Sequence, residues 1–262
     1  MKVIILAAGQ GTRLRPLTDD RPKCMVEVNG SSIIERQLNV MYACGIKQED
    51  ITIIAGYRGE VLKKKFENSS LHFIINREYE STNMVYSLMC ARRLMEEQED
   101  ILISYGDIIY NEDVLQKILM AESDASVIVD DGWYSYWSER CENPLDDAET
   151  LLFDENDLLL EIGQKTSDLN RIKAQYIGLM RFRESGLEAM LDIAKAAEER
   201  TEQGLPLWRT LRTYSKMYMT DLLQGMIEEG YGLKAVHINR GWFEIDDCED
   251  LKVVEAKLQE EM

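Results

Sequence analysis

The stretch VIILAAGQGTRLRPLTDDRPK, residues 3–23, indicates how the fold begins. Its first residues, 3–6, form a short apolar run that is typical of a buried strand. Small residues follow at once, among them Gly9 and Gly11, and these allow backbone N–H groups to come close to a phosphate chain. The stretch therefore predicts a phosphate-binding loop directly after the first strand.

The charges around this loop differ from those of the whole chain. From Gly11 to Lys23 there are four basic and two acidic residues, whereas the 262-residue chain carries a net charge of −18. Cations beside backbone donors can hold a triphosphate and stabilise a departing pyrophosphate. The acidic total argues against a nucleic-acid or anionic-membrane surface, because both need a basic face. We therefore expect a local phosphate site in an acidic protein.

Two other glycine motifs do not fit the loop. A dinucleotide-binding fingerprint needs a third glycine where this chain has Leu14. A Walker loop needs Gly-Lys-Ser/Thr, which is absent from the sequence. The remaining alternative is a glycine turn without a ligand.

Strand and helix patterns alternate along the first half of the chain. Apolar runs at 51–55, 72–75, 101–105 and 125–129 predict strands, and helical patterns lie between them, one opened by the capping-box spacing of Ser32 and Glu35. Such alternation predicts a single α/β domain, residues 1–262, with a Rossmann-like, mostly parallel sheet flanked by helices. After residue 130 the pattern changes, so residues 131–262 would form an elaborated second half of this domain.

The motif GxGTRLxPLT at residues 9–18, with PKCM at 22–25 and Gly56-Tyr57, resembles a known family. It is similar to the nucleotidylyltransferases, which join a nucleoside triphosphate to a phosphorylated acceptor. The resemblance runs to the C-terminus and implies the fold of the nucleotide-diphospho-sugar transferases. It also implies that residues 1–130 form the nucleotide-binding half and residues 131–262 the acceptor-binding half.

The resemblance also implies a nucleotide site. Gly56 and Asn83 would lie near the base and ribose, and Lys23 and Arg13 would be the catalytic cations. The residues implied to bind the nucleotide are Leu6, Ala7, Ala8, Gly9, Gly11, Thr12, Arg13, Lys23, Gly56, Asn83 and Tyr105.

Carboxylates follow two of the predicted strands. Asp107 lies just after strand 101–105, at the sheet edge where α/β proteins bind ligands. Glu244 and Asp246 are two residues apart, so in an extended segment both face one side. Carboxylates from distant segments can share Mg²⁺. We therefore expect a magnesium site at Asp107 and Asp246, with Glu244 either a third ligand or a structural acceptor.

Aromatic residues follow the predicted strand 125–129, in the segment DDGWYSYWSER at 130–140. Aromatic faces beside carboxylates suit an amine or a quaternary ammonium group. Arg140 or Lys165 would hold the acceptor's phosphate, the lysine by analogy with the family. Alternatively, the aromatic residues are partly buried packing. The residues predicted to bind the acceptor are Asp130, Trp133, Trp137, Arg140 and Lys165.

Three further strings, at 143–151, 175–178 and 218–224, resemble one branch of the family. That branch contains cytidylyltransferases for phosphoglutamine, 2-aminoethylphosphonate and phosphocholine. The resemblance implies CTP as nucleotide, a small phosphorylated acceptor, and a role in capsule or surface-polysaccharide modification. Residue chemistry alone leaves CTP, UTP and dTTP open.

Two alternatives are kept. One is a hexose-1-phosphate uridylyl- or thymidylyltransferase. The other is a nucleotide-binding regulatory module without catalysis, which should lack Lys23 or a metal acid, although this chain has Lys23, Asp107 and Asp246.

The five cysteines are odd in number and have no CxxC spacing, which favours a reducing cytoplasm. The first apolar run is far below the ~18 residues of a membrane span. We expect a cytoplasmic enzyme without nucleic-acid or membrane partners, and a possible homodimer.

Overall fold

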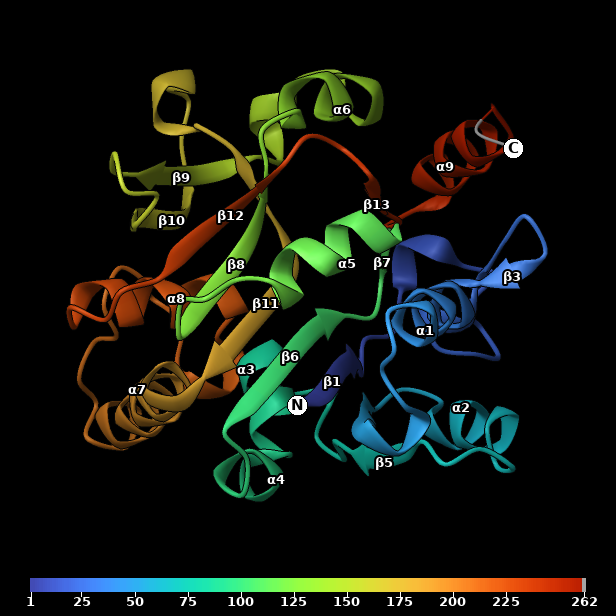
Figure 1. Ribbon diagram of the computed structural model, residues 1–262, viewed down its shortest axis with the longest axis horizontal. Helices are drawn as coiled ribbons and strands as arrows, with labels where there is room; N and C mark the ends of the chain where they lie inside the picture. The colour runs from blue at the N-terminus through green and yellow to red at the C-terminus, as the bar shows by residue number, and fades with distance from the viewer. Residues whose placement is uncertain (261–262) are drawn as a thin grey trace.

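The central element is a seven-stranded sheet, seen in the computed structural model, which describes residues 1–260 (Figure 1). The strand order is β12-β8-β11-β6-β1-β4-β5, and every neighbouring pair is parallel except those that β11 makes. The prediction of a mostly parallel sheet is confirmed. The strands are β1 (Lys2–Ala7), β4 (Ile51–Ala55), β5 (His72–Ile75), β6 (Asp100–Tyr105), β8 (Ala125–Asp130), β11 (Gln175–Arg183) and β12 (Lys234–Ile238).

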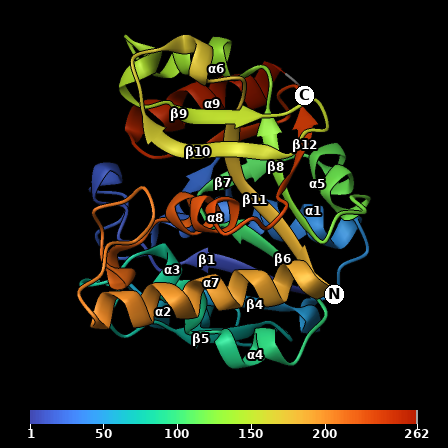
Figure 2. The same ribbon diagram turned by 90° about the vertical axis from the view of Figure 1, so that its left-hand side faces the viewer.

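Helices cover both faces of this sheet because the strands are apolar on both sides. Val3 and Ile5 of β1 pack into one cluster, with residues of α1 and α5. Ile4 and Leu6 pack into the other, with residues of α7 and α8, which lie in front of the sheet in Figure 2. The helices are α1 (Ile33–Ala43), α2 (Gly59–Lys65), α3 (Met84–Met89), α4 (Arg92–Glu96), α5 (Glu112–Leu119), α6 (Trp133–Arg140), α7 (Glu184–Glu202), α8 (Met219–Glu228) and α9 (Cys248–Glu260).

Small antiparallel pairs complete the fold. The hairpin of β9 (Glu149–Phe153) and β10 (Leu159–Lys165) packs on α8. Two further pairs join β7 (Ile108–Tyr110) to β13 (Trp242–Glu244) and β2 (Glu27–Val28) to β3 (Ser31–Ser32). The central sheet takes strands from both 1–130 and 131–262. Within residues 1–260, no helix is long and apolar enough to cross a membrane.

Helix boundaries follow local chemistry. The carboxylate of Glu35 accepts a hydrogen bond from the Ser32 backbone N–H (3.0 Å), which caps α1 as the spacing predicts. Asn83 caps α3 by accepting from the Met84 N–H (2.9 Å).

Candidate active site

A pocket of about 130 Å³ lies at the carboxyl ends of β1 and β6. It brings together Leu6, Ala8, Gly9 and Asn83 with Asp107. The Gly106 N–H donates to the Leu6 carbonyl (2.9 Å), which holds the two strand ends side by side. The pocket is also lined by Tyr79, Thr82, Met84 and Ser87, which we did not predict and whose sequence signal is their position around the Asn83 helix cap.

The glycine loop is shaped by its contact with Lys23. Gly11 has φ +62°, and a Cβ there would lie 2.9 Å from the Cβ of Lys23. The Thr18 hydroxyl donates to the Gly11 carbonyl (2.8 Å) and holds the loop in this form. Thr12 follows in a 3-10 turn, Thr12–Leu14. Only glycine fits this position, because it combines left-handed backbone with close packing.

Two more of the residues predicted to bind the nucleotide, Gly56 and Ala7, lie next to the loop. A Cβ on Gly56 would lie 2.7 Å from the carbonyl oxygen of Ala8, so the two backbones touch. Ala7 is buried at the end of β1. Tyr105 ends β6, two residues before Asp107, and its ring packs edge-on against Tyr176 at 5.7 Å.

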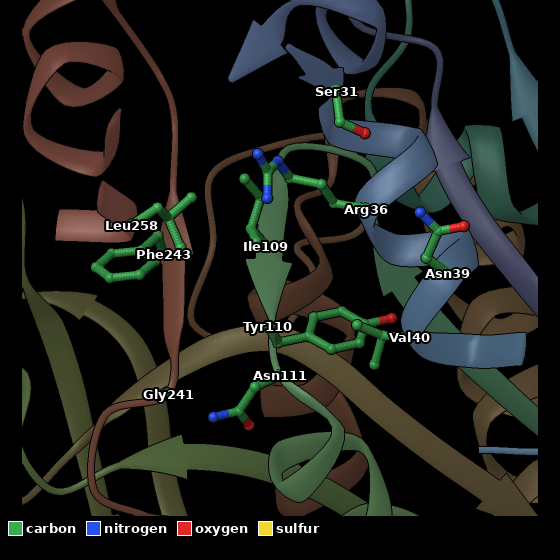
Figure 3. A pocket seen from close by; sticks show the side chains of 10 residues that line it. All are labelled: Ser31, Arg36, Asn39, Val40, Ile109, Tyr110, Asn111, Gly241, Phe243 and Leu258. Carbon is green, nitrogen blue, oxygen red and sulfur yellow. The ribbon is translucent and has the colours of Figure 1, made fainter. Parts of the chain in front are cut away.

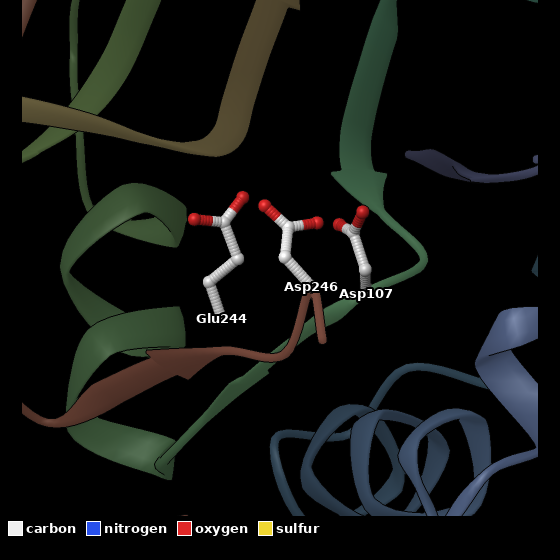
Figure 4. Close-up of side chains that lie close together, drawn as sticks. All are labelled: Asp107, Glu244 and Asp246. Atoms are coloured by element: carbon white, nitrogen blue, oxygen red, sulfur yellow. The ribbon is translucent and has the colours of Figure 1, made fainter. Parts of the chain in front are cut away.

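Asp107, Glu244 and Asp246 form the acidic cluster (Figure 4). One carboxylate oxygen from each lies within 4.8 Å of the others. The Ile245 N–H donates to the Asp107 carbonyl (3.1 Å) and ties the two segments together. Oδ1 of Asp107 is buried and finds no hydrogen-bond partner among residues 1–260. Hard carboxylate oxygens with one free acceptor fit the donor set of Mg²⁺.

Two basic side chains reach the acidic cluster from the glycine loop. Nζ of Lys23 lies 2.7 Å from Oδ2 of Asp107 and 2.5 Å from Oδ1 of Asp246. Burial acts to lower the pKa of Lys23, but the charges of the two aspartates outweigh it and raise that pKa above its ordinary value. Arg13 is more exposed, and its guanidinium lies 3.0 Å from Asp246. The two predicted catalytic cations thus meet the predicted metal ligands.

Arg140 lies on the other side of the acidic cluster, with its side chain only 5% exposed. Its guanidinium donates to both oxygens of Asp250 (2.8 and 3.0 Å) and to Glu244 (3.0 Å). Asp250 in turn accepts from the Asp246 N–H (2.8 Å). Three N–H groups of Arg140 are therefore engaged by carboxylates, and the side chain holds these acids in position. That Arg140 contacts the acceptor's phosphate stays a prediction.

Burial argues against a direct acceptor contact for three of the predicted residues. Asp130 is fully buried, and its carboxylate accepts from Arg240 (2.7 Å) and from the Trp242 indole (2.8 Å). Trp133 and Trp137 are 5% and 4% exposed and pack in the core. The packing alternative is correct, because α6 turns these rings inward against β13. None of the three offers a surface to an acceptor.

Lys165 ends β10, and its exposed ammonium donates to the backbone carbonyl of Asp147 (2.7 Å). It stays a predicted phosphate contact.

A separate pocket of about 360 Å³ lies between α1 and the β7–β13 pair (Figure 3). It is lined by Arg36, Tyr110 and Phe243 among others, and contains none of the predicted site residues.

The chain is similar to known proteins in both sequence and structure. Residues 3–167 match the model of the MobA-like NTP transferase domain. The chain is 39% identical to the CTP:phosphoglutamine cytidylyltransferase of Campylobacter jejuni over 258 residues, which cover 97% of this chain and 98% of the relative. It is 42% identical to the choline-phosphate cytidylyltransferase of Streptococcus pneumoniae over 92 residues, 35% of this chain and 39% of the relative. A solved structure, the CTP:phosphocholine cytidylyltransferase of Streptococcus pneumoniae, superposes with a TM-score of 0.71 at 23% identity, covering 98% of each chain.

Proposed function

Because the chain belongs to the MobA-like NTP transferase family and is a nucleotidyltransferase, we propose that it transfers a cytidylyl group from CTP to a small phosphorylated amine and releases pyrophosphate. The observation that carries this proposal is the meeting of Lys23 with Asp107 and Asp246 beside the glycine loop. The relative that is similar over nearly full length, named a CTP:phosphoglutamine cytidylyltransferase, supports the choice of CTP. The acceptor class comprises phosphoglutamine, aminoethylphosphonate and phosphocholine.

The reaction follows from charge and position. An ionised oxygen of the acceptor's phosphate attacks the α-phosphorus of CTP, and a new P–O bond forms. The bond from that phosphorus to the bridging oxygen breaks, and pyrophosphate leaves with the electron pair. Because the acceptor is already ionised, no protein nucleophile and no proton transfer are needed. Catalysis is then positioning and charge stabilisation.

The chain's own residues have distinct roles in this scheme. The backbone of the Ala8–Gly11 loop binds the phosphates, and Lys23 and Arg13 stabilise the negative charge that develops on them. Asp107 and Asp246, with Glu244, would hold Mg²⁺, which supplies charge neutralisation at phosphate oxygens when bound. Residues 1–130 serve the nucleotide and residues 131–262 the acceptor.

The experiment is pyrophosphate release from CTP, UTP, dTTP, ATP and GTP, each paired with phosphoglutamine, 2-aminoethylphosphonate, phosphocholine or glucose 1-phosphate. We expect turnover with CTP and an amine-bearing acceptor. Turnover only with UTP or dTTP and glucose 1-phosphate would establish the sugar-nucleotide alternative instead. Omitting the divalent cation, and restoring it as Mg²⁺ or Mn²⁺, tests the metal requirement in the same assay.

We also propose that the enzyme is cytoplasmic, that it forms a homodimer, and that it takes part in capsule or surface-polysaccharide modification. Fractionation of cells and sedimentation of the purified protein test the first two.

A further inference from the structure

Glu149 is a carboxylate that the chemistry above does not use. It begins β9, and its side chain lines a small pocket between the β9–β10 hairpin, β11 and the start of α8. The hairpin lies against α8 in Figure 2. In the part of the chain that the structure describes, this carboxylate makes no hydrogen bond or ion pair. Burial raises the pKa of Glu149 to about 7. Glu149 is half-buried, so a carboxylate there without a protein partner can receive a cation from outside the protein.

The charged groups nearest Glu149 are engaged elsewhere. Lys165 is its register partner in the hairpin, but the lysine ammonium donates to the carbonyl of Asp147 (2.7 Å). Arg212, from the segment before α8, is paired with Asp221 at 3.0 Å. After burial, the charges of Lys165 and Arg212 lower the pKa of Glu149, and those of Asp147 and Asp221 raise it.

The pocket lies next to the candidate active site. Tyr176 lines it, and the ring of Tyr176 packs edge-on against Tyr105 at 5.7 Å. Tyr105 ends β6, two residues before Asp107. The two rings therefore link the wall of the pocket to the end of β6, which is followed by Asp107. An acceptor whose phosphate lies at the cluster can extend its other end toward Glu149, where the Tyr176 ring adds to the attraction for a cation.

The size of the pocket limits what can enter. Its open volume is about 30 Å³. Because one water needs about 10–15 Å³ on this measure, the pocket admits an ammonium group but not a trimethylammonium group. Thr220 forms a close wall, since a Cβ on Gly163 would lie 2.4 Å from its Cβ. Because this wall forms where β10 packs on α8, the pocket has little room to widen.

We propose that Glu149 binds the primary ammonium group of the acceptor and makes the enzyme select primary amines over quaternary ones. This inference rests on the proposed function and refines its substrate class. It assigns recognition of the amine to the β9–β10 hairpin and not to Trp133 and Trp137, which are buried. Phosphoglutamine and aminoethylphosphonate carry such a group, whereas phosphocholine does not.

The test compares acceptors that differ only at this end: O-phosphoethanolamine, its uncharged isostere propyl phosphate, and its trimethylated form phosphocholine. With CTP and the wild-type protein, we expect kcat/KM for O-phosphoethanolamine to exceed that of each of the others by about 10–100-fold, as for one charge-assisted hydrogen-bonded pair. In E149Q the ratio of O-phosphoethanolamine to propyl phosphate should fall close to one, with KM for CTP unchanged. E155Q, an exposed acid of the same hairpin, is the matched control.

Two results would overturn the proposal. One is an unchanged ratio in E149Q, and the other is equal use of phosphocholine and O-phosphoethanolamine by the wild type. If none of these acceptors is turned over, calorimetric binding of O-phosphoethanolamine and propyl phosphate decides. Tighter binding of the amine that disappears in E149Q supports Glu149 even though the proposed reaction has failed, and equal binding of both compounds refutes it.

Discussion

The ammonium group of Lys23 lies 2.5 Å from Oδ1 of Asp246, although the two residues are 223 positions apart. The same ammonium lies 2.7 Å from Asp107. A lysine thus stands between the carboxylates that are best suited to hold a divalent cation. Since two cations cannot share that position, we expect Lys23 to move toward the nucleotide phosphates when the metal enters.

Replacing Lys23 by alanine should therefore tighten metal binding in the absence of nucleotide. Removing one positive charge a few ångströms from the site should raise Mn²⁺ affinity about tenfold or more. Mn²⁺ titration followed by electron paramagnetic resonance measures this directly, and K47A, at an exposed lysine, serves as the control. Unchanged or weaker binding in K23A would show that Lys23 does not compete with the metal. Turnover should fall by about two to three orders of magnitude, because a transition-state donor is lost.

Asp107→Asn should keep the fold and lose activity. An amide is a much poorer ligand for Mg²⁺ than a carboxylate, and we expect kcat to fall about 100-fold or more, by analogy with the loss of other transition-state stabilising groups. Steady-state kinetics measure kcat, and circular dichroism confirms the fold. Near-wild-type turnover would remove Asp107 from the metal site.

Arg140→Met should destabilise the protein. The change leaves the carboxylates of Asp250 and Glu244 without their buried partner, and breaking such a pair costs about 3–5 kcal/mol. Urea unfolding measures the free energy. R93M, which breaks an exposed pair with Glu97, should cost below about 1 kcal/mol. Equal effects in both variants would mean that Arg140 is not a buried counter-ion.

Glu149→Gln should stabilise the protein at alkaline pH. Burial raises the pKa of Glu149 to about 7 in the folded state, above its value of 4.5 in the unfolded chain. The stability that the protonated carboxyl contributes is present below pH 4.5 and is lost as the pH rises through 7. At pH 8 we expect Tm to be a few degrees higher in E149Q than in the wild type, and near pH 4.5 the two should agree. Thermal unfolding at both pH values, with E155Q as control, checks this. A lower Tm in E149Q at pH 8 would indicate a structural role.

Much of the fold was predictable because its signals are local. Five apolar runs bounded by polar and glycine residues predicted strands that the structure contains, and the Ser32–Glu35 spacing predicted the start of α1. The antiparallel direction of β11 had no such signal, since it depends on the path of the chain around the sheet. The helical segment between β5 and β6 is divided near Cys90 into α3 and α4.

For the site, too, the local features could be predicted from the sequence and the contacts between distant elements could not. The sequence by itself indicated the glycine loop and Asp107, because they follow the neighbouring parallel strands β1 and β6, whose ends meet at one edge of the sheet. The antiparallel pairing of β13 with β7 brings Glu244 and Asp246 to the same place. Tertiary structure alone decided which charges are paired and which rings are buried. Arg140 meets Asp250, 110 positions away, and Trp133 packs into the core. The carboxylate of Glu149 has no partner within residues 1–260. Such outcomes depend on contacts between distant elements, and the energy of a charge or ring depends on those contacts more than on its neighbours in sequence.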